Sequence, residues 1–140
     1  MILRILKIIF LLILVSNNVL AGTNYFNEGL ILYTNKEFDK ARFKFEQDIV
    51  FNPKNEKSYL YLSKIFNEQK KKELEEKNLN TVILLNPKNE EATYNLAQLK
   101  LQNSDFKESK SLIDKLLMFC KNYCEKSQIL KIEIENSLKK

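Results

Sequence analysis

Across residues 25–138, apolar residues recur at spacings of three and four, and short polar breaks divide them into segments. This spacing places the apolar side chains on one face of a helix, whereas a half-buried strand would alternate apolar and polar residues. Each pair of segments around a polar break therefore predicts two antiparallel helices. The pattern indicates an all-α chain built from helical hairpins.

The pentapeptide NPKNE occurs at Asn52–Glu56 and again at Asn86–Glu90, so the second copy begins 34 positions after the first (86 − 52 = 34). The residue before a proline is disfavoured in the α region, so the first asparagine of each copy is expected to end a helix. The final glutamate then lies in the first turn of the next helix, where a negative charge interacts favourably with the helix dipole. Each copy therefore marks a boundary between two helical units.

The 34-residue period, the helix–turn–helix unit and the proline at its end resemble the tetratricopeptide repeat. The first unit matches at its small contact residues, its large apolar residues and its final proline: Gly29, Phe38, Ala41, Phe45 and Pro53. The third unit keeps Leu96, Ala97, Phe106, Ser109, Ile113 and Leu116. The resemblance spans about Thr23–Asn122 and implies a right-handed α-solenoid, a stack of antiparallel helical hairpins.

The domain is expected over residues 22–140, with repeat units at about 22–55, 56–89 and 90–122. The last unit of such a stack would leave an apolar face in water unless another element covered it. A capping helix is therefore predicted over residues 123–138. Its apolar residues Ile129, Ile132 and Leu138, with Leu130 and Ile134 nearby, are expected to cover the third unit.

The second unit departs from the pattern at two positions of its second helix. Lys72 replaces the aromatic residue, and Glu75 stands where a small contact residue is expected. An unpaired glutamate buried between two helices would cost several kcal/mol. We expect either that this helix pair splays apart or that the second helix rotates to bring Leu74 inward.

Residues 1–21 have the three-part pattern of a secretory signal peptide. Arg4 and Lys7 precede the uncharged apolar run Ile8–Val15, and a polar break leads to small residues suited to cleavage after Ala21. The alternative is an uncleaved membrane anchor, but the run is much shorter than the ~20 residues that span a bilayer. We therefore expect export to the bacterial periplasm or the cell exterior, with no stable membrane span after cleavage.

Charge and composition exclude several classes of function. The formal net charge of +5 falls to about +3 once Arg4 and Lys7 are removed, and positive and negative residues alternate along the remainder. The only basic run, Lys70–Lys72, is followed at once by glutamates, so no nucleic-acid partner is expected. The chain contains no histidine, no glycine-rich phosphate loop and no nucleophile elbow. We therefore expect no catalytic residues, no enzyme activity and no cofactor.

Cys120 and Cys124 lie at the junction between the third unit and the capping helix. Two cysteines in an exported protein are compatible with a disulfide. A regular helix would be a marginal fit to disulfide geometry, but a break at Lys121–Tyr123 would let the sulfur atoms approach. A pair of free or buried thiols is the alternative. A metal site with two thiols and no histidine is not expected.

In the tetratricopeptide family, the first helices of successive units line a concave groove that binds a peptide or a partner segment. The resemblance therefore places a partner-binding groove at Phe26, Asn27, Leu30, Tyr33, Leu60, Tyr61, Lys64, Asn67, Tyr94, Asn95, Gln98 and Leu101. The family's clamp for a C-terminal carboxylate uses lysine, arginine and asparagine in all three units. Because Lys64 is the only basic residue in this set, we expect an apolar and amide-rich groove rather than that clamp.

These features predict an exported, non-catalytic adaptor or scaffold that binds a protein or peptide segment. The alternative is a structural protein that self-associates into a homo-oligomer. The latter is favoured by the lack of a cap before Tyr25, which is expected to expose Phe26 and Leu30 on the first helix.

Overall fold

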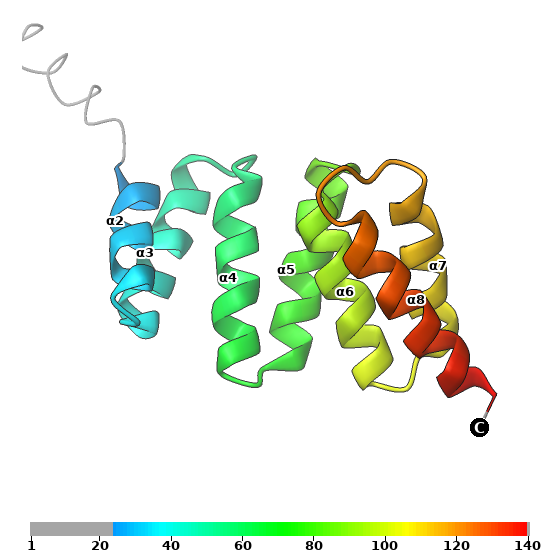
Figure 1. Cartoon of the computed structure of the whole chain (residues 1–140). Helices are drawn as coiled ribbons and strands as arrows, with labels where there is room; N and C mark the ends of the chain where they lie inside the picture. The colour runs from blue at the N-terminus through cyan, green and yellow to red at the C-terminus, as the bar shows by residue number, and fades with distance from the viewer. Residues whose placement is uncertain (1–23, 140) are drawn as a thin grey trace, which may run out of the picture.

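The structure, a computed structural model, describes residues 24–139, so the predicted signal peptide lies outside the described residues. These residues form helices only: α2 (Tyr25–Thr34), α3 (Phe38–Phe51), α4 (Glu56–Glu68), α5 (Lys72–Leu85), α6 (Glu90–Gln102), α7 (Phe106–Leu117) and α8 (Cys124–Leu138). The helices pack in chain order, each against the next, in an elongated stack with α2 and α8 at opposite ends (Figure 1). The predicted all-α class is confirmed. In the part of the chain described, no helix is long and apolar enough to cross a membrane.

The turn inside each helical pair has the same backbone conformation. Lys36, Lys70 and Ser104 recur at the 34-residue period, and all three have a positive φ of 57–61°. In each turn the next residue's N–H bonds the carbonyl five residues back, as in the bond from Glu37 to Leu32. A left-handed residue at this point is the usual way to end a helix. The repeat is therefore present in the turn conformation as well as in the sequence.

The core also follows the repeat. Phe45, Leu79 and Ile113 occupy the same position in the three units, and each is fully buried there. A Cβ added to Gly29 would lie 2.7 Å from the Phe45 ring. The structure thus shows why the first helix needs a residue without a side chain here, because the Phe45 ring occupies that space.

A buried polar cluster joins the first two units. Asp48, which is 1 % exposed, accepts hydrogen bonds from Ser58 Oγ and from Asn55 Nδ2 at 2.6 Å, and from Asn52 Nδ2 at 3.0 Å. The equivalents of Asp48 and Ser58 one repeat later are Val82 and Ala92, which are both buried in an apolar core cluster. The same junction is thus polar between units one and two and apolar between units two and three.

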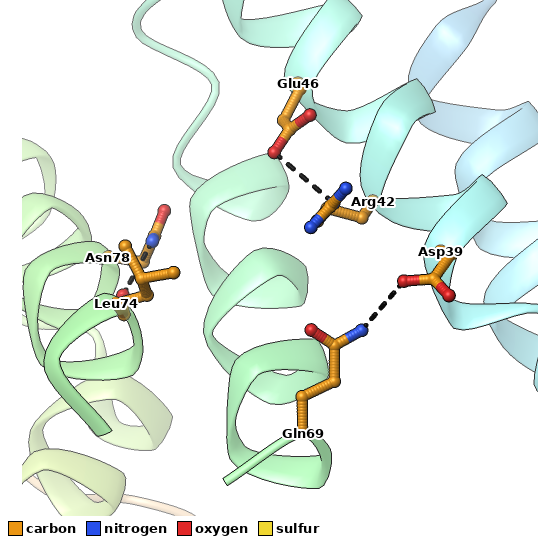
Figure 2. Close-up of polar contacts among 6 residues, drawn as sticks. All are labelled: Asp39, Arg42, Glu46, Gln69, Leu74 and Asn78. Atoms are coloured by element: carbon orange, nitrogen blue, oxygen red, sulfur yellow. Dashed lines mark hydrogen bonds and ion pairs between the residues drawn. The ribbon is translucent and has the colours of Figure 1, made fainter. Parts of the chain in front are cut away.

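Polar contacts on the outside of the stack lie both between helices and within them. Figure 2 shows Asp39, near the start of α3, accepting a hydrogen bond at 3.1 Å from Gln69, just beyond the end of α4. Within α3, Arg42 lies 3.6 Å from Glu46. Within α5, the Asn78 amide donates to the Leu74 carbonyl oxygen at 2.8 Å.

Both expectations for the second unit are wrong. Helices α4 and α5 stay packed together, so the pair does not splay. Leu74 remains exposed, and Glu75 takes the inward position at 5 % exposure, so α5 does not rotate. The physical reason is that the Glu75 carboxylate accepts a hydrogen bond from Asn67 Nδ2 at 3.0 Å, which compensates part of the cost of burial.

Helix α8 covers the third unit with two of the five apolar residues predicted to do so, and the prediction is wrong for the other three. Leu130 and Ile134 are buried against Ile113 and Leu116, whereas Ile129, Ile132 and Leu138 are exposed. Both faces of α8 carry isoleucine, so the pattern admits either orientation. An ion pair from Lys131 Nζ to Asp114 on α7, at 2.6 Å, accompanies the observed rotation.

The prediction for the other end of the stack is also wrong in detail. Phe26 and Leu30 are half-buried, because they pack against the core cluster of the first unit. The exposed apolar residue of α2 is Ile31, at 63 %. Its counterparts in the next units, Ile65 and Leu99, are buried, and each of those units has another unit before it. No helix among the described residues precedes α2, and this position is therefore open.

The glutamate of each NPKNE copy binds the end of the following unit. Glu56 accepts a hydrogen bond from the Asn86 side chain at 3.0 Å. Glu90 accepts three, from the backbone N–H groups of Lys121, Asn122 and Tyr123, at 2.8–2.9 Å. These bonds span 30–33 residues and join the start of each unit to its own end, so they hold the two helices of the unit together.

We predict that Lys70→Gly stabilises the protein by about 0.5–1 kcal/mol, because a left-handed conformation costs a residue with a Cβ about 1–2 kcal/mol. The greater chain entropy of glycine offsets about half of this gain. The control is Lys71→Gly, where φ is −94° and glycine should only destabilise. Urea unfolding measures both changes; equal effects at the two positions would contradict the explanation.

A double-substitution cycle tests the Asp48 cluster. Ser58→Ala should cost about 1–3 kcal/mol, because a buried carboxylate loses a donor. The double variant Asp48→Val/Ser58→Ala reproduces the Val82–Ala92 pair and should recover most of that loss. Urea unfolding at neutral pH gives the change in unfolding free energy for Asp48→Val, for Ser58→Ala and for the double variant. Ser111→Ala is the exposed control. A double variant as unstable as the sum of the single variants would refute the equivalence of the two junctions.

The Glu90 contacts predict a pH dependence. The backbone N–H groups of residues 121–123 hold the pKa of Glu90 below its ordinary value of 4.5 in the folded state. This carboxylate therefore contributes stability above its unfolded-state pKa, and the contribution is lost as the pH falls through the lowered pKa. In melting curves recorded from neutral to acidic pH, the advantage of the unmodified chain over Glu90→Gln should shrink in that acidic range. Glu125→Gln, an exposed change, should show no such trend.

Candidate functional site

A cavity of about 160 Å³ opens between α2, α4, α5 and α6. Its lining is mainly amide, carboxylate and aromatic groups: Tyr33, Ser63, Lys64, Asn67, Glu68, Glu75, Asn95, Gln98, Leu99 and Gln102. Five of the residues predicted for the groove, Tyr33, Lys64, Asn67, Asn95 and Gln98, meet here. The first helices of the three units contribute most of the lining, and α5 contributes Glu75.

Glu75 is the buried acidic group of this cavity. Its position corresponds to Ala41 and Ser109 in the other units, which are small and fully buried. Burial raises the pKa of Glu75, and the Asn67 hydrogen bond and the Lys72 charge lower it by less. Within residues 24–139, only Asn67 donates to this carboxylate, and it does so to Oε1. Oε2 therefore remains able to accept a hydrogen bond from a bound group.

Lys64 is the only basic residue in the cavity lining, and its charge is already engaged. Its Nζ lies 2.7 Å from Glu91 Oε1 on α6 and 4.7 Å from the centre of the Tyr61 ring. This ion pair links the first helices of units two and three. The cavity lining and the Lys64 ion pair thus hold three carboxylates, Glu68, Glu75 and Glu91, against the one ammonium group of Lys64, and Lys72 acts on Glu75 from outside the lining.

Tyr33 is the aromatic residue of the cavity lining, and further rings pack behind it. The Tyr33 and Tyr61 rings meet edge to face at 5.1 Å, and Tyr61 stacks on Phe45 at 5.2 Å. A second cavity shares Tyr33 and Glu68 with the first and is lined also by Tyr61 and Phe38. Burial raises the pKa of the Tyr33 hydroxyl, so this group is neutral and can donate a hydrogen bond at physiological pH. The two neighbouring cavities, which also have Lys36 at the edge of the second, are together called the hollow below; its aromatic residues are Tyr33, Phe38 and Tyr61, and its acidic residues are Glu68 and Glu75.

Seven of the predicted groove residues lie outside the first cavity. Leu60 is buried in the core with Leu79 and Leu96, because it precedes Tyr61 by one helical position and so points about 100° away. Phe26 and Leu30 pack on the first-unit core. The others lie on different surfaces: Asn27 donates to Asn24, Tyr61 lines the second cavity, Tyr94 packs on Tyr123, and Leu101 lines a separate cavity with residues of α8.

Five lining residues are not in the predicted groove set: Ser63, Glu68, Glu75, Leu99 and Gln102. Glu68 and Gln102 are in the last turns of α4 and α6, one helical turn beyond Lys64 and Gln98. Continuing the groove spacing by one more turn would have found them. Glu75 was noticed as an irregularity of the core, and only the packed structure shows that its carboxylate reaches the cavity.

The structure joins Cys120 and Cys124 by a disulfide with a Cα–Cα distance of 5.3 Å. The backbone between them is irregular at residues 121–123, and α8 begins at Cys124. The disulfide and the three bonds to Glu90 hold the same short loop. Within the described residues, no three His, Cys, Asp or Glu side chains gather closely enough to hold a metal ion.

Comparisons with known proteins were made for the sequence and for the structure. No family model matches the sequence, and no curated protein sequence matches it. Solved structures do match. The first tetratricopeptide-repeat domain of Spaghetti (RPAP3), bound to an HSP90 peptide, has a TM-score of 0.75 at 16% identity, over 83% of this chain and 91% of its own.

Two further structures have the same architecture. The TPR2B domain of yeast Sti1, in a complex with pHsp70, has a TM-score of 0.74 at 12% identity, over 81% of this chain and 94% of its own. The Yersinia enterocolitica secretion chaperone SycD, with a peptide of the translocator YopD, has a TM-score of 0.72 at 14% identity, over 81% of this chain and 89% of its own. At these identities the likeness establishes the fold alone. The chain has the fold of a tetratricopeptide-repeat domain.

Proposed function

We propose that this protein is a non-catalytic adaptor that binds a peptide or an extended segment of a partner protein. The observation that carries the proposal is the hollow formed by the first helices of the three units, with amide groups and aromatic rings at its surface. Amide side chains both donate and accept hydrogen bonds, and so can pair with the backbone of an extended segment. Tyrosine rings add contact area at a low cost in conformational entropy.

The similar structures support a peptide as the ligand class. RPAP3 is bound to an HSP90 peptide, and SycD to a peptide of YopD. We propose the same general use of the concave side here, with a different chemistry of recognition, because the one lysine of this cavity is paired with Glu91.

We further propose that the protein is exported to the bacterial periplasm or the cell exterior. The signal-peptide pattern of residues 1–21 supports this proposal. The disulfide between Cys120 and Cys124 also supports it, because disulfides persist mainly in oxidising compartments.

Self-association is the second candidate, and one observation favours it. Ile31 is exposed at a position that is buried in the two following units. A second copy that stacked on this end would bury Ile31 as Ile65 and Leu99 are buried within the chain. The resulting homo-oligomer would be a structural protein rather than an adaptor.

Site-specific photocrosslinking separates the two candidates. p-Benzoylphenylalanine is placed at Gln102 in the cavity, at Asn80 on the exposed side of α5, or at Ile31 at the open end. The adaptor hypothesis predicts a distinct partner adduct from Gln102 that is absent from Asn80. Self-association predicts dimer adducts from Ile31. If Gln102 and Asn80 give the same adducts, the cavity is not the binding site.

A further inference from the structure

The charge distribution of the cavity is the opposite of that of a carboxylate-binding site. Glu68 and Glu75 both line it, whereas Lys64 is held by Glu91 and the Tyr61 ring. A ligand carboxylate would meet two carboxylates and would gain little from the engaged ammonium. A ligand cation would meet two carboxylates directly.

The Glu75 side chain is a second observation that indicates a ligand. It is 5 % exposed and belongs to the cavity lining, and its Oε2 atom receives no hydrogen bond from the described part of the chain. Burial of a carboxylate disfavours its charged form, and the single Asn67 bond compensates only part of that cost. A donor of a bound segment that reached Oε2 in the cavity would compensate more of it.

The Tyr33 ring in the cavity lining adds a preference for a flat cation. Tyr33 lies between the two cavities, close to Glu68, and its ring is positioned by Phe38 and Tyr61 at 5.5 and 5.1 Å. Cations are attracted to the faces of aromatic rings, and this molecule already shows the contact between Lys64 and Tyr61. A guanidinium can stack on such a ring and still use its edge for hydrogen bonds.

We infer that this cavity receives an arginine side chain of the partner segment, which binds Glu75 and Glu68 and stacks against Tyr33. The inference rests on the function proposed above. Guanidinium has five N–H donors in a planar fork, which suits two carboxylates. The amide oxygens of Asn95, Gln98 and Gln102 can accept the remaining donors. Lysine, with its compact ammonium, would satisfy fewer of these groups.

Peptide selection tests the inference even though the partner is unidentified. Random dodecapeptides displayed on phage are selected against the full chain, and each selected peptide is then synthesised for isothermal titration calorimetry. We expect arginine to be enriched at one position. Replacing that arginine by glutamine should weaken binding at least about tenfold, and replacing it by lysine should weaken binding less.

Three protein variants locate the arginine site. Glu75→Gln keeps an oxygen for the Asn67 hydrogen bond, and Glu68→Gln changes an exposed residue, so both are expected to fold. Each variant should weaken binding of the arginine peptide at least about tenfold and leave the affinity for its glutamine version unchanged. Glu73→Gln, an exposed residue of α5 outside the cavity lining, is the matched control and should leave both affinities unchanged. Circular dichroism melting curves verify the fold of each variant.

The outcomes distinguish the inference from the function on which it rests. If the selected peptides bind the cavity but carry no basic residue, or end in a required carboxylate, the arginine inference is wrong and the adaptor function stands. Labelled Asn95 and Gln98 side-chain amides report cavity binding by NMR. If the selection yields no peptide, or only peptides that leave these signals unshifted, both proposals are wrong. A loss of arginine affinity that is equal for Glu73→Gln and Glu75→Gln would also overturn the inference.

Discussion

A helical hairpin of this length can bury only one face within itself, and the whole stack follows from that limit. The remaining apolar residues of each hairpin must be covered by a neighbouring hairpin. Ile65 and Leu99 are buried in this way, whereas Ile31, at the same position of the first unit, is exposed. The third unit is covered by α8 through Leu130 and Ile134. Among the described residues, the two ends of the stack therefore differ: α8 covers the third unit, and no helix covers Ile31 of the first.

Stacking of this kind requires the two helices of each unit to keep a fixed position relative to each other. The glutamate of each NPKNE copy contributes to this, because it binds groups 30–33 residues further along the chain, at the end of the unit that it begins. At the last junction, the disulfide from Cys120 to Cys124 restrains the same loop that Glu90 binds. The sequence motif is thus both the boundary of one unit and a contact to the end of the following unit.

The candidate site is located where the repeat departs from its own rule. Positions equivalent to Glu75 hold alanine and serine in the other units, where small side chains let the helices approach. Glu75 retains this packing because Asn67 donates to it, yet its charge is disfavoured by burial, which raises its pKa. A local conflict with the fold is expected at functional sites, where binding rather than stability determines the residue. The acidic and aromatic character of the hollow follows from this one exchange together with Glu68, Tyr33 and Tyr61.

The helical class, the 34-residue period and the helix ends before Pro53 and Pro87 could be predicted from the chain alone, because they follow from local rules. Apolar spacing, proline and capping preferences act within a few residues of the chain. The contact of Gly29 with Phe45 could also be anticipated from the repeat pattern. The groove was predicted in part, because residues one turn apart on a first helix, such as Lys64 and Asn67, share a face whatever the neighbouring helices do.

Three outcomes required the packed molecule: which of two apolar faces α8 buries, that Leu60 belongs to the core, and that Glu75 reaches the cavity. Neighbouring positions of a helix point about 100° apart, so a rotation of the helix by that angle or less decides which side chain is buried. They are settled by contacts across helices, such as the ion pair from Lys131 to Asp114 and the hydrogen bond from Asn67 to Glu75. A pattern along one helix does not contain these contacts, because the partner group lies on another helix.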